Sequence, residues 1–304
     1  MPTEVIDPPG AELEVEAARV SAEVDSFFGR LLAPTGDSRE CLYEAMRHAA
    51  IGGGKRLRPL LTVAASRLFA IDPARALRAG CAIEAIHVYS LIHDDLPCMD
   101  NAELRRGKLT VHKAFGEAEA VLAGDSLHAL AFEILAHPAT HEDPWVRSDL
   151  VLELARAAGP SGMAGGQMMD LAAEGRQLDI PAITRLQQLK TGALIEYSVE
   201  AACIMNKLPA DARTPYRGYA RNIGLAFQIA DDLIDHSGDE AAAGKPTGRD
   251  ANAGKATFVS LLGPERARQQ AALLVGQAIE HLGDHGSEAD LLRAIARFAI
   301  ERDR

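Results

Sequence analysis

The chain contains the stretch Ile223-Gly224-Leu225-Ala226-Phe227-Gln228-Ile229-Ala230-Asp231-Asp232-Leu233-Ile234-Asp235. Its first part is apolar enough to bury a helix. Because an α-helix stacks residues i and i+4 on one face, Asp231 and Asp235 should project together, with Gln228 one turn before them. A charged helix end is the alternative interpretation, although carboxylates at a helix carboxyl terminus oppose the macrodipole. Taken alone, the spacing leaves metal binding and a plain helix end equally open.

A second doubled aspartate occurs earlier, in the stretch Asp94-Asp95-Leu96-Pro97-Cys98-Met99-Asp100. An ideal helix would place Asp94 and Asp100 about 120° apart. Pro97 clashes with the carbonyl of His93, so the helix should bend or end here. Such a break could bring Asp100 back toward Asp94. A simple helix stop is the alternative, which the other aspartate cluster makes less favoured.

The two clusters together contain six carboxylates. Carboxylates that lie close together raise one another's pKa unless cations lie between them. Mg²⁺ takes oxygen ligands and usually keeps substrate phosphates in its remaining positions. The paired clusters therefore indicate an enzyme that acts on a diphosphate.

The remaining sequence is dominated by helical periodicity, with Gly and Pro in the gaps, and it lacks alternating β-branched strands. We expect an all-α fold in a single domain, residues 1–304, with residues 1–15 disordered. No internal repeat is evident. The predicted helices are 11–33, 38–51, 57–70, 74–95, 117–136, 145–158, 181–206, 211–236, 264–282 and 286–302.

Composition excludes several classes of protein. The chain has 32 Lys and Arg against 43 Asp and Glu, a formal charge of −11, which argues against a nucleic-acid binder and an electrostatic membrane surface. The four cysteines form no CxxC pair, as expected of free thiols in a reducing compartment. The acidic N-terminus is no signal peptide, and no apolar run is long enough for a membrane span. We expect a cytoplasmic protein.

Positive charge is concentrated in two places. The stretch Gly52-Gly53-Gly54-Lys55-Arg56-Leu57-Arg58-Pro59 resembles a phosphate loop but fails the Walker A pattern. Its glycines still let backbone N–H groups approach an anion, and Lys55 and Arg58 add charge. A solvent-exposed basic turn is the usual interpretation of the stretch Arg105-Arg106-Gly107-Lys108. Beside a metal-bound diphosphate it would supply bidentate partners.

Three further features are ambiguous. His87 shares a helix face with Asp94, and a satisfied core histidine is the commoner explanation. Lys190-Thr191-Gly192 interrupts a helix, which predicts a kink or a close backbone approach, with Lys190 directed at an anion. The Gly-rich segment 238–254, followed by Lys255, is either a lid over an anion or a plain connection.

Taken in order, these motifs resemble the short-chain trans-polyprenyl diphosphate synthases, most closely the bacterial farnesyl diphosphate synthases. The resemblance covers about residues 20–302. It implies an all-α helical bundle around a deep central cavity, the isoprenoid synthase type I fold, and a homodimer. The paired aspartate motifs with the two arginines between them are far more specific than any one motif alone.

The resemblance assigns roles to individual residues. It implies up to three Mg²⁺ per active site, with Mn²⁺ as an alternative, held by Asp94, Asp95, Asp100, Asp231, Asp232 and Asp235. It implies contacts to the allylic diphosphate from Arg105, Lys190, Thr191, Gln228, Lys245 and Lys255. Isopentenyl diphosphate would bind through Lys55, Arg58, His87 and Arg106, which reverses the core interpretation of His87. The catalytic set would be Asp94, Asp95, Asp100, Arg105, Lys190, Thr191, Gln228 and Asp231.

The implied reaction is the head-to-tail (1'-4) condensation of isopentenyl diphosphate with dimethylallyl and geranyl diphosphate, which yields (E,E)-farnesyl diphosphate. No activated nucleophile is apparent in the sequence, and ionisation of an allylic diphosphate needs none. The isopentenyl double bond, held close by its own diphosphate site, would attack the allylic cation. Alternatives are the same chemistry ending at C10 or C20, a terpene cyclase, or a non-catalytic partner subunit.

Product length is expected to depend on Tyr89 and Ser90, which precede the first aspartate cluster by about one helical turn. Ideal geometry puts Ser90 closer to the Asp94 face, so the assignment of Tyr89 as the cavity floor relies on the resemblance. Asn101 and Ala102 replace acidic residues that are common in the family, and Leu109 replaces a frequent proline. We expect these departures to alter metal affinity at most.

Overall fold

The helical pattern extends through nearly all of the computed structural model, which describes residues 9–173, 178–237 and 257–301. The all-α prediction is confirmed. The α-helices are α1 (Pro9–Leu31), α2 (Glu40–Ala50), α3 (Leu57–Arg67), α4 (Pro73–Asp94), α5 (Val111–Ala114), α6 (Glu117–Ala136), α7 (Pro144–Ala158), α8 (Met163–Ala173), α9 (Ile180–Gln187), α10 (Ala193–Met205), α11 (Thr214–Ser237), α14 (Phe258–Leu262), α15 (Pro264–Glu280) and α16 (Asp290–Glu301). A π-helix, η1, spans Gln188–Gly192, and the 3₁₀-helices η2 and η3 span Ala210–Arg213 and Ser287–Ala289.

Three differences from the predicted elements are informative. Helix α8 was not expected, because the glycines around it are loop signals in sequence. A two-residue hairpin, β1 (Leu104–Arg105) and β2 (Lys108–Leu109), was also missed. Its turn residues Arg106 and Gly107 both have positive φ, the conformation that a tight hairpin requires. Helix α1 begins at Pro9, within the segment 1–15 that was expected to be disordered, and residues 1–8 lie outside the described residues.

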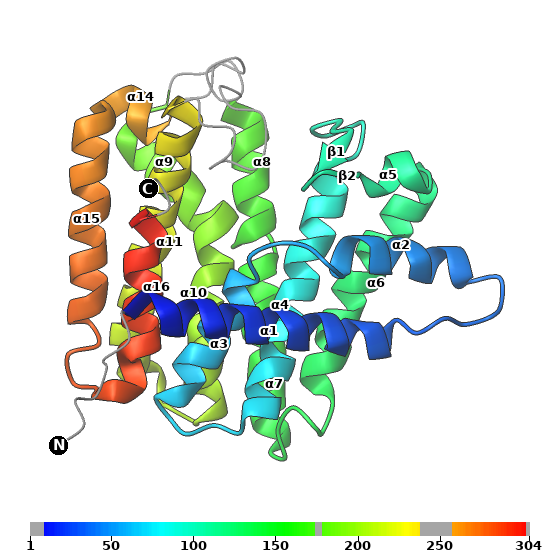
Figure 1. Ribbon diagram of the computed structural model, residues 1–304, viewed down its shortest axis with the longest axis horizontal. Helices are drawn as coiled ribbons and strands as arrows, with labels where there is room; N and C mark the ends of the chain where they lie inside the picture. The colour runs from blue at the N-terminus through cyan, green and yellow to red at the C-terminus, as the bar shows by residue number, and fades with distance from the viewer. Residues whose placement is uncertain (1–8, 174–177, 238–256, 302–304) are drawn as a thin grey trace.

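The long helices pack side by side in a bundle that α1 crosses on one face (Figure 1). Helix α4 packs between α6 and α3, α3 packs on α10, and α10 packs on α7 and α11, while α11 packs on α15. Val20, Val24 and Phe28 of α1 are fully buried, so the crossing helix is part of the core. Among the described residues, no helix combines the length and apolar character needed to cross a membrane.

Helices α3 and α4 approach each other closely because α4 carries a glycine at their contact. A Cβ at Gly80 would lie 2.9 Å from the Pro59 Cα, a distance that real side chains do not tolerate. Pro59 lies in the first turn of α3, directly after the Gly-rich loop. The close contact therefore fixes this loop against the middle of α4.

Candidate active site

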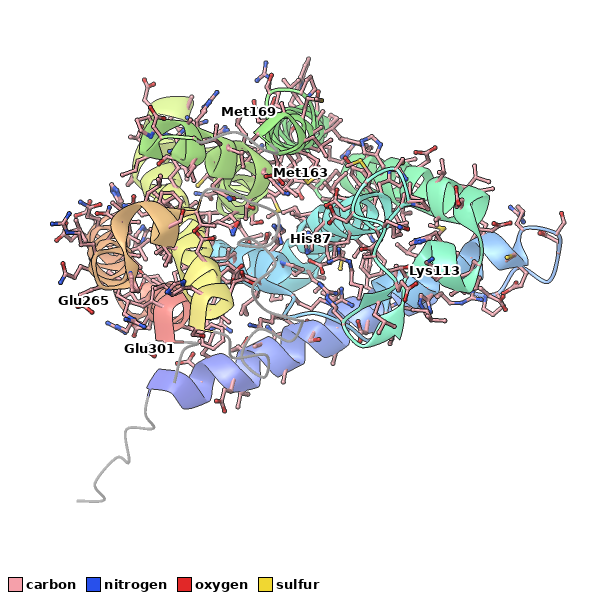
Figure 2. The ribbon with its side chains drawn as sticks, turned by 90° about the horizontal axis from the view of Figure 1, so that it is seen from above. His87, Lys113, Met163, Met169, Glu265 and Glu301 are labelled. Atoms are coloured by element: carbon pink, nitrogen blue, oxygen red, sulfur yellow. The ribbon has the colours of Figure 1, made fainter. Side chains whose placement is uncertain are left out.

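A cavity of about 820 Å³ lies among the loop before α3, the middle of α4, η1, α10 and α11. It brings the Gly-rich loop opposite the second aspartate cluster. In the view from above, the labelled His87 lies toward the middle of the bundle, whereas Glu265 and Glu301 lie at its edge (Figure 2). Of the predicted site residues, this cavity is lined by Lys55, Arg58, His87, Arg106, Thr191, Gln228, Asp231 and Asp235.

A second cavity, of about 300 Å³, adjoins the first and shares Arg58, His87 and Thr191 with it. Met163 and Gln167 of α8 supply another part of its wall. Of the predicted site residues, it is lined by Arg58, His87, Tyr89, Ser90, Asp94, Lys190 and Thr191. The two cavities therefore join the cationic loop to both aspartate clusters.

The first aspartate cluster folds back on itself as the Pro97 argument predicted. Helix α4 ends at Asp94, and the backbone N–H of Asp100 donates to the Asp94 carbonyl at 2.8 Å. The next residue, Asn101, has a φ of 47°, a left-handed conformation that asparagine adopts more readily than most residues. The tight turn brings the backbone of Asp100 against the end of α4.

Asp95 points away from the two large cavities. Both of its carboxylate oxygens accept hydrogen bonds from Arg105, from Nε and Nη2, each at 2.7 Å. The two residues line a small neighbouring hollow of about 50 Å³ beside the hairpin. As far as the described residues define the cavity walls, Asp95, Asp100, Arg105 and Asp232 line neither large cavity. Lys245 and Lys255, with the predicted lid, lie outside the described residues.

The electrostatics of Asp94 differ from those of an ordinary aspartate. Burial raises the pKa of Asp94 to about 6, and the neighbouring carboxylates Asp100 and Asp95 act in the same direction. Lys190 and Arg105 oppose this rise. A half-buried carboxylate with this environment is a strong candidate for a group that functions with a cation.

The second cluster has the one-face arrangement that the four-residue spacing predicted. Gln228, Asp231 and Asp235 all line the larger cavity from α11. Asp232 lies on a different side, where its Oδ2 accepts from the Phe258 backbone N–H at 2.9 Å, at the start of α14. The carboxylate of Asp232 thus joins α14 to α11.

The Lys190-Thr191-Gly192 interruption is the π-helix η1, and a close backbone approach occurs there as predicted. A Cβ at Gly166 of α8 would lie 2.1 Å from the Lys190 backbone nitrogen. The Lys190 Nζ atom forms an ion pair with Asp170 Oδ2 at 2.6 Å. π-Helical turns are often found at functional sites, and this one exposes Thr191 to both cavities.

The wall around the Gly-rich loop is strongly cationic. Burial lowers the pKa of Arg58 and of Arg106, and burial with the surrounding guanidinium groups lowers the pKa of His87 well below its usual range. Gly54, with a φ of 84°, lies so close to the Arg106 guanidinium that a Cβ would be 2.5 Å from it. Only glycine fits both conditions.

Sequence reasoning missed several residues of this region. Arg56 is buried and paired with Glu84 and Asp25, although the sequence predicted a role only for its neighbours Lys55 and Arg58. Asp170 and Gln167 lie on α8, which was not predicted. Met163 and Gln167, which line the smaller cavity, and Asp170, which pairs with Lys190, recur at helical spacing, and this periodicity could have revealed the helix.

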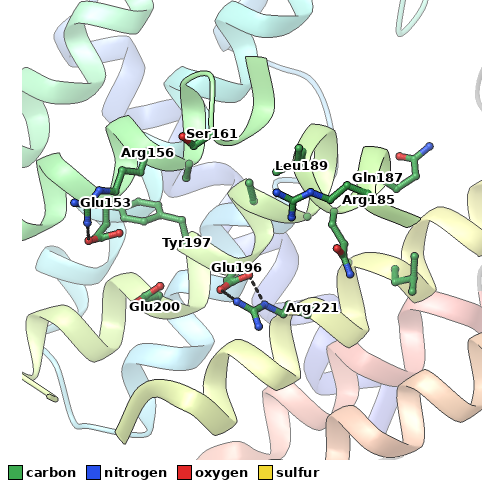
Figure 3. A pocket seen from close by; sticks show the side chains of 16 residues that line it. Glu153, Arg156, Ser161, Arg185, Gln187, Leu189, Glu196, Tyr197, Glu200 and Arg221 are labelled. Carbon is green, nitrogen blue, oxygen red and sulfur yellow. Dashed lines mark hydrogen bonds and ion pairs between the residues drawn. The ribbon is translucent and has the colours of Figure 1, made fainter. Parts of the chain in front are cut away.

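Another cavity, of about 510 Å³, lies against α7, α9, η1, α10 and α11 (Figure 3). Four of its charged side chains form two pairs: Arg221 binds Glu196 through two hydrogen bonds, at 2.8 and 2.9 Å, and Arg156 binds Glu153 at 2.6 Å. No aspartate of either cluster is among its lining residues. It is therefore a weaker candidate for a diphosphate site.

The donor set fits a divalent cation only with help from a bound anion. Within the described ranges, no three His, Cys, Asp or Glu side chains are close enough to hold an ion by themselves. The carboxylates facing the joined cavities, those of Asp94, Asp231 and Asp235, offer the hard oxygen ligands that Mg²⁺ prefers. Diphosphate oxygens would complete such a coordination shell.

Known proteins match almost the whole chain. The polyprenyl synthetase family model matches residues 39–296. Farnesyl diphosphate synthase of Escherichia coli (strain K12) is 40% identical over 93% of this chain and 96% of that protein. Geranylgeranyl pyrophosphate synthase 11 of Arabidopsis thaliana is 44% identical over 84% of this chain and 73% of that protein. A crystal structure of an FPP/GFPP synthase from Zymomonas mobilis superposes with a TM-score of 0.89 at 57% identity, covering 95% of this chain and 99% of that one.

Proposed function

Because this chain belongs to the polyprenyl synthetase family and is a prenyltransferase, we propose that it makes (E,E)-farnesyl diphosphate. The proposed reaction joins isopentenyl diphosphate head-to-tail (1'-4) to dimethylallyl diphosphate and then to geranyl diphosphate. The observation that carries the proposal is the pair of joined cavities, with a cationic loop on one wall and aspartates on the other. Two diphosphates can then bind at separate sites with their hydrocarbon ends facing each other.

Isopentenyl diphosphate is proposed to bind the cationic wall, through Lys55, Arg58, His87 and Arg106. All four line the larger cavity. Because its pKa is lowered, His87 is neutral near pH 7 and offers one N–H donor and one acceptor. The arginines supply charge and forked donors suited to phosphate. A terpene cyclase would not need this second diphosphate site, so the cationic wall favours a synthase.

The allylic diphosphate is proposed to bind the aspartate wall. Asp94, Asp231 and Asp235 would hold up to three Mg²⁺ ions, or Mn²⁺, with Asp100 and Asp232 contributing from the cluster edges. When bound, the ions would stabilise the negative charge on the departing diphosphate. Lys190 adds positive charge on the same side, and Lys245 and Lys255 are proposed to contact the same group. Asp95, held by Arg105, is proposed to fix the position of that guanidinium beside the metal site.

The chain's own groups then guide the hydrocarbon chemistry. The cavity wall formed by η1 presents Thr191, while α11 presents Gln228. Their carbonyl oxygens are proposed to stabilise the allylic cation without attacking it. The isopentenyl double bond attacks the cation carbon, a new C–C bond forms, and the released pyrophosphate takes the proton that is lost. Positioning of two substrates can supply a large part of such a rate enhancement.

A fifteen-carbon product is proposed because the two predicted chain-length residues line the smaller cavity. Tyr89 and Ser90 line it, and the Ser90 hydroxyl donates to the His87 carbonyl at 2.8 Å, which keeps that short side chain against its own helix. Tyr89 contacts His128 edge to face, with ring centroids 5.0 Å apart, so its ring is held in place. Products of ten or twenty carbons remain the alternatives, as the names of the relatives span several lengths.

A homodimer of single-domain subunits in the cytoplasm is also proposed. Helix α6 exposes the large apolar side chains Val121 and Leu122, at 42% and 54%, as a surface for self-association would. All four cysteines are free, in keeping with a reducing compartment. The sedimentation behaviour of the purified protein tests the dimer directly.

The test of the reaction is incubation of the purified protein with isopentenyl and dimethylallyl diphosphates and Mg²⁺, followed by dephosphorylation and sizing of the alcohols. Farnesol as the main alcohol supports the proposal, and geraniol or geranylgeraniol would overturn the length alone. Parallel samples with EDTA should make no product and should keep their helical circular dichroism, because the helices are held together by a core of apolar side chains. Absence of condensation with Mg²⁺ present would refute the proposed function.

A further inference from the structure

Arg56 lies in the middle of the Gly-rich loop and is among the residues that line the larger cavity, but its guanidinium is bound to protein groups. Its side chain is fully buried, and its backbone has a φ of 47° and a ψ of 35°, a left-handed conformation at the start of α3. Such a conformation is strained for a long side chain and persists only where the surroundings enforce it. Lys55 and Arg58 line the same cavity, and the side chain of Arg56 is buried between these two cations.

The inward side chain joins three separate elements. Its Nη1 donates to Glu84 Oε1 of α4 at 2.9 Å, and its Nη2 donates to Asp25 Oδ1 of α1 at 2.7 Å. Nη2 also donates, at 2.6 Å, to the carbonyl of Ala50, the last residue of α2. A planar guanidinium can satisfy these acceptors together, whereas an ammonium group cannot match the fork.

Asp25 also holds the other end of the glycine loop. Its second oxygen, Oδ2, accepts from the Gly52 backbone N–H at 3.1 Å. One carboxylate from the crossing helix α1 is therefore bonded both to Gly52 and to the side chain of Arg56. The loop between them, Gly53 to Lys55, is fixed at both ends by the same network.

Arg56 also neutralises a carboxylate that would oppose substrate binding. Glu84 is 2% exposed and lines the large cavity, beside the proposed diphosphate ligands Arg58 and Arg106. A buried anion there would repel a diphosphate and compete for these arginines. The ion pair with Arg56 offsets that charge and leaves the substrate-facing arginines available.

We propose that Arg56 is a positioning residue for the isopentenyl diphosphate site, which it shapes by tying the Gly52–Gly54 loop to Asp25 and by neutralising Glu84. The inference rests on the proposed function, because it concerns one of the two substrates of that reaction. It predicts that the network sets the affinity for isopentenyl diphosphate and leaves the aspartate wall unaffected.

The first test is Arg56→Lys, which keeps the charge and loses the fork, together with Asp25→Asn. The KM for isopentenyl diphosphate should rise about tenfold in Arg56→Lys, the effect expected from loss of one charge-assisted hydrogen bond, and less in Asp25→Asn. The KM for dimethylallyl diphosphate should stay within about twofold of the parent. Equal rises in both KM values would overturn the proposal, since they would indicate that the substitution disturbs the whole protein and not the isopentenyl diphosphate site alone.

Glu200→Gln is the matched control. Like Glu84, Glu200 is a buried glutamate in an ion pair, here with Arg213 at 3.3 Å and with Arg217, but it lies on α10 and lines the cavity of Figure 3. It should lower the melting temperature and leave the KM for isopentenyl diphosphate unchanged. If it raised this KM as much as Arg56→Lys did, the effect would be one of stability and the proposal would fail.

A rescue experiment tests the neutralising role. Arg56→Met should bind isopentenyl diphosphate more weakly than Arg56→Lys, because Glu84 is then unpaired. The double variant Arg56→Met with Glu84→Gln should recover part of the lost affinity. A double variant no better than Arg56→Met would refute this role. If Arg56→Met does not fold, the same comparison between Arg56→Lys and Arg56→Lys with Glu84→Gln decides the question.

Two measurements, condensation by the parent protein and direct titration of parent and variant with isopentenyl diphosphate, distinguish failure of the proposed function from failure of the positioning role. If the parent protein condenses no substrates, the proposed function fails, whatever the Arg56 variants do. If the parent condenses them and Arg56→Lys binds isopentenyl diphosphate as tightly as the parent, the positioning role alone fails.

Discussion

The carboxylate of Asp95 and the guanidinium of Arg105 form a bidentate pair, with both N···O distances at 2.7 Å. Asp95 directly follows the last residue of α4, and Arg105 lies in the hairpin strand β1. The pair therefore ties the hairpin to the end of the helix that carries Asp94. The two carboxylates of the doubled aspartate lie in different environments: Asp94 lines the cavity, and Asp95 is bound to an arginine.

Replacement of Arg105 by lysine should reduce turnover about tenfold to 100-fold, because a point charge cannot reproduce the two parallel hydrogen bonds. Steady-state kcat with saturating substrates is the measurement. Arg221→Lys is the control, since Arg221 also forms a bidentate pair, with Glu196, beside a cavity that no aspartate of either cluster lines. Similar losses in both variants would show that the Asp95–Arg105 pair has no special role.

Truncation of Tyr89 or of His128 should lengthen the product. Tyr89→Ala removes the proposed floor, and His128→Ala removes the ring that holds Tyr89 in place, so the second effect should be smaller and give a mixture. Chromatography of the dephosphorylated alcohols measures the distribution. Tyr216→Ala, a similar truncation at a tyrosine that lines neither cavity, should retain the parent product. A purely C15 product from Tyr89→Ala would contradict the floor assignment.

The free protein should lose stability below about pH 6.5, in part because of His87. Its pKa is lowered by burial and by the nearby arginines, so the unfolded chain binds this proton more readily than the folded one. Stability from this group is therefore present above about pH 6.5 and is lost as the pH falls, by at most about 1.4 kcal/mol per pH unit. In His87→Asn, the melting temperature should fall less than the parent's between about pH 7 and pH 5. If the melting temperatures of His87→Asn and of the parent fell equally over this pH range, His87 would not be the cause of the loss.

Gly166→Ala should damage the protein more than an ordinary helix substitution. The new Cβ would lie 2.1 Å from the Lys190 nitrogen, so α8 and η1 must separate, at a cost of about 1–3 kcal/mol, with Lys190 displaced. Gly276→Ala in α15 meets nothing within 4 Å and should stabilise by up to about 1 kcal/mol. Chemical denaturation and kcat measure both variants. A neutral Gly166→Ala would show that the contact can relax freely.

The helix periods, the proline break and the four-residue carboxylate spacing could be read from the sequence because each depends on local geometry. Asp231 and Asp235 share a face for that reason, and Asp100 returns to Asp94 because Pro97 ends the helix. The inward turn of Arg56 could not be read, since its partners Asp25 and Glu84 come from distant elements. The same holds for Asp95, whose orientation depends on a hairpin turn closed by two positive φ values. Helix α8 was not predicted, because glycines are loop signals in a sequence. In the structure, a glycine of this helix allows close packing instead.

The π-helix η1 makes the number of residues between α9 and α10 structurally important. A π-turn accommodates one residue more than an α-helical turn does, so η1 holds an additional residue between α9 and α10 while the two helices keep nearly the same rotational register. Deletion of a single residue between Gln188 and Gly192 would therefore let the segment relax to a continuous α-helix, with Ile195 and Val199 of α10 still in the core. The fold should tolerate this deletion, but Lys190 and Thr191 would lose the π-helical geometry that places them at the cavities. The residue count of this short segment is thus as much a part of the candidate active site as its side chains.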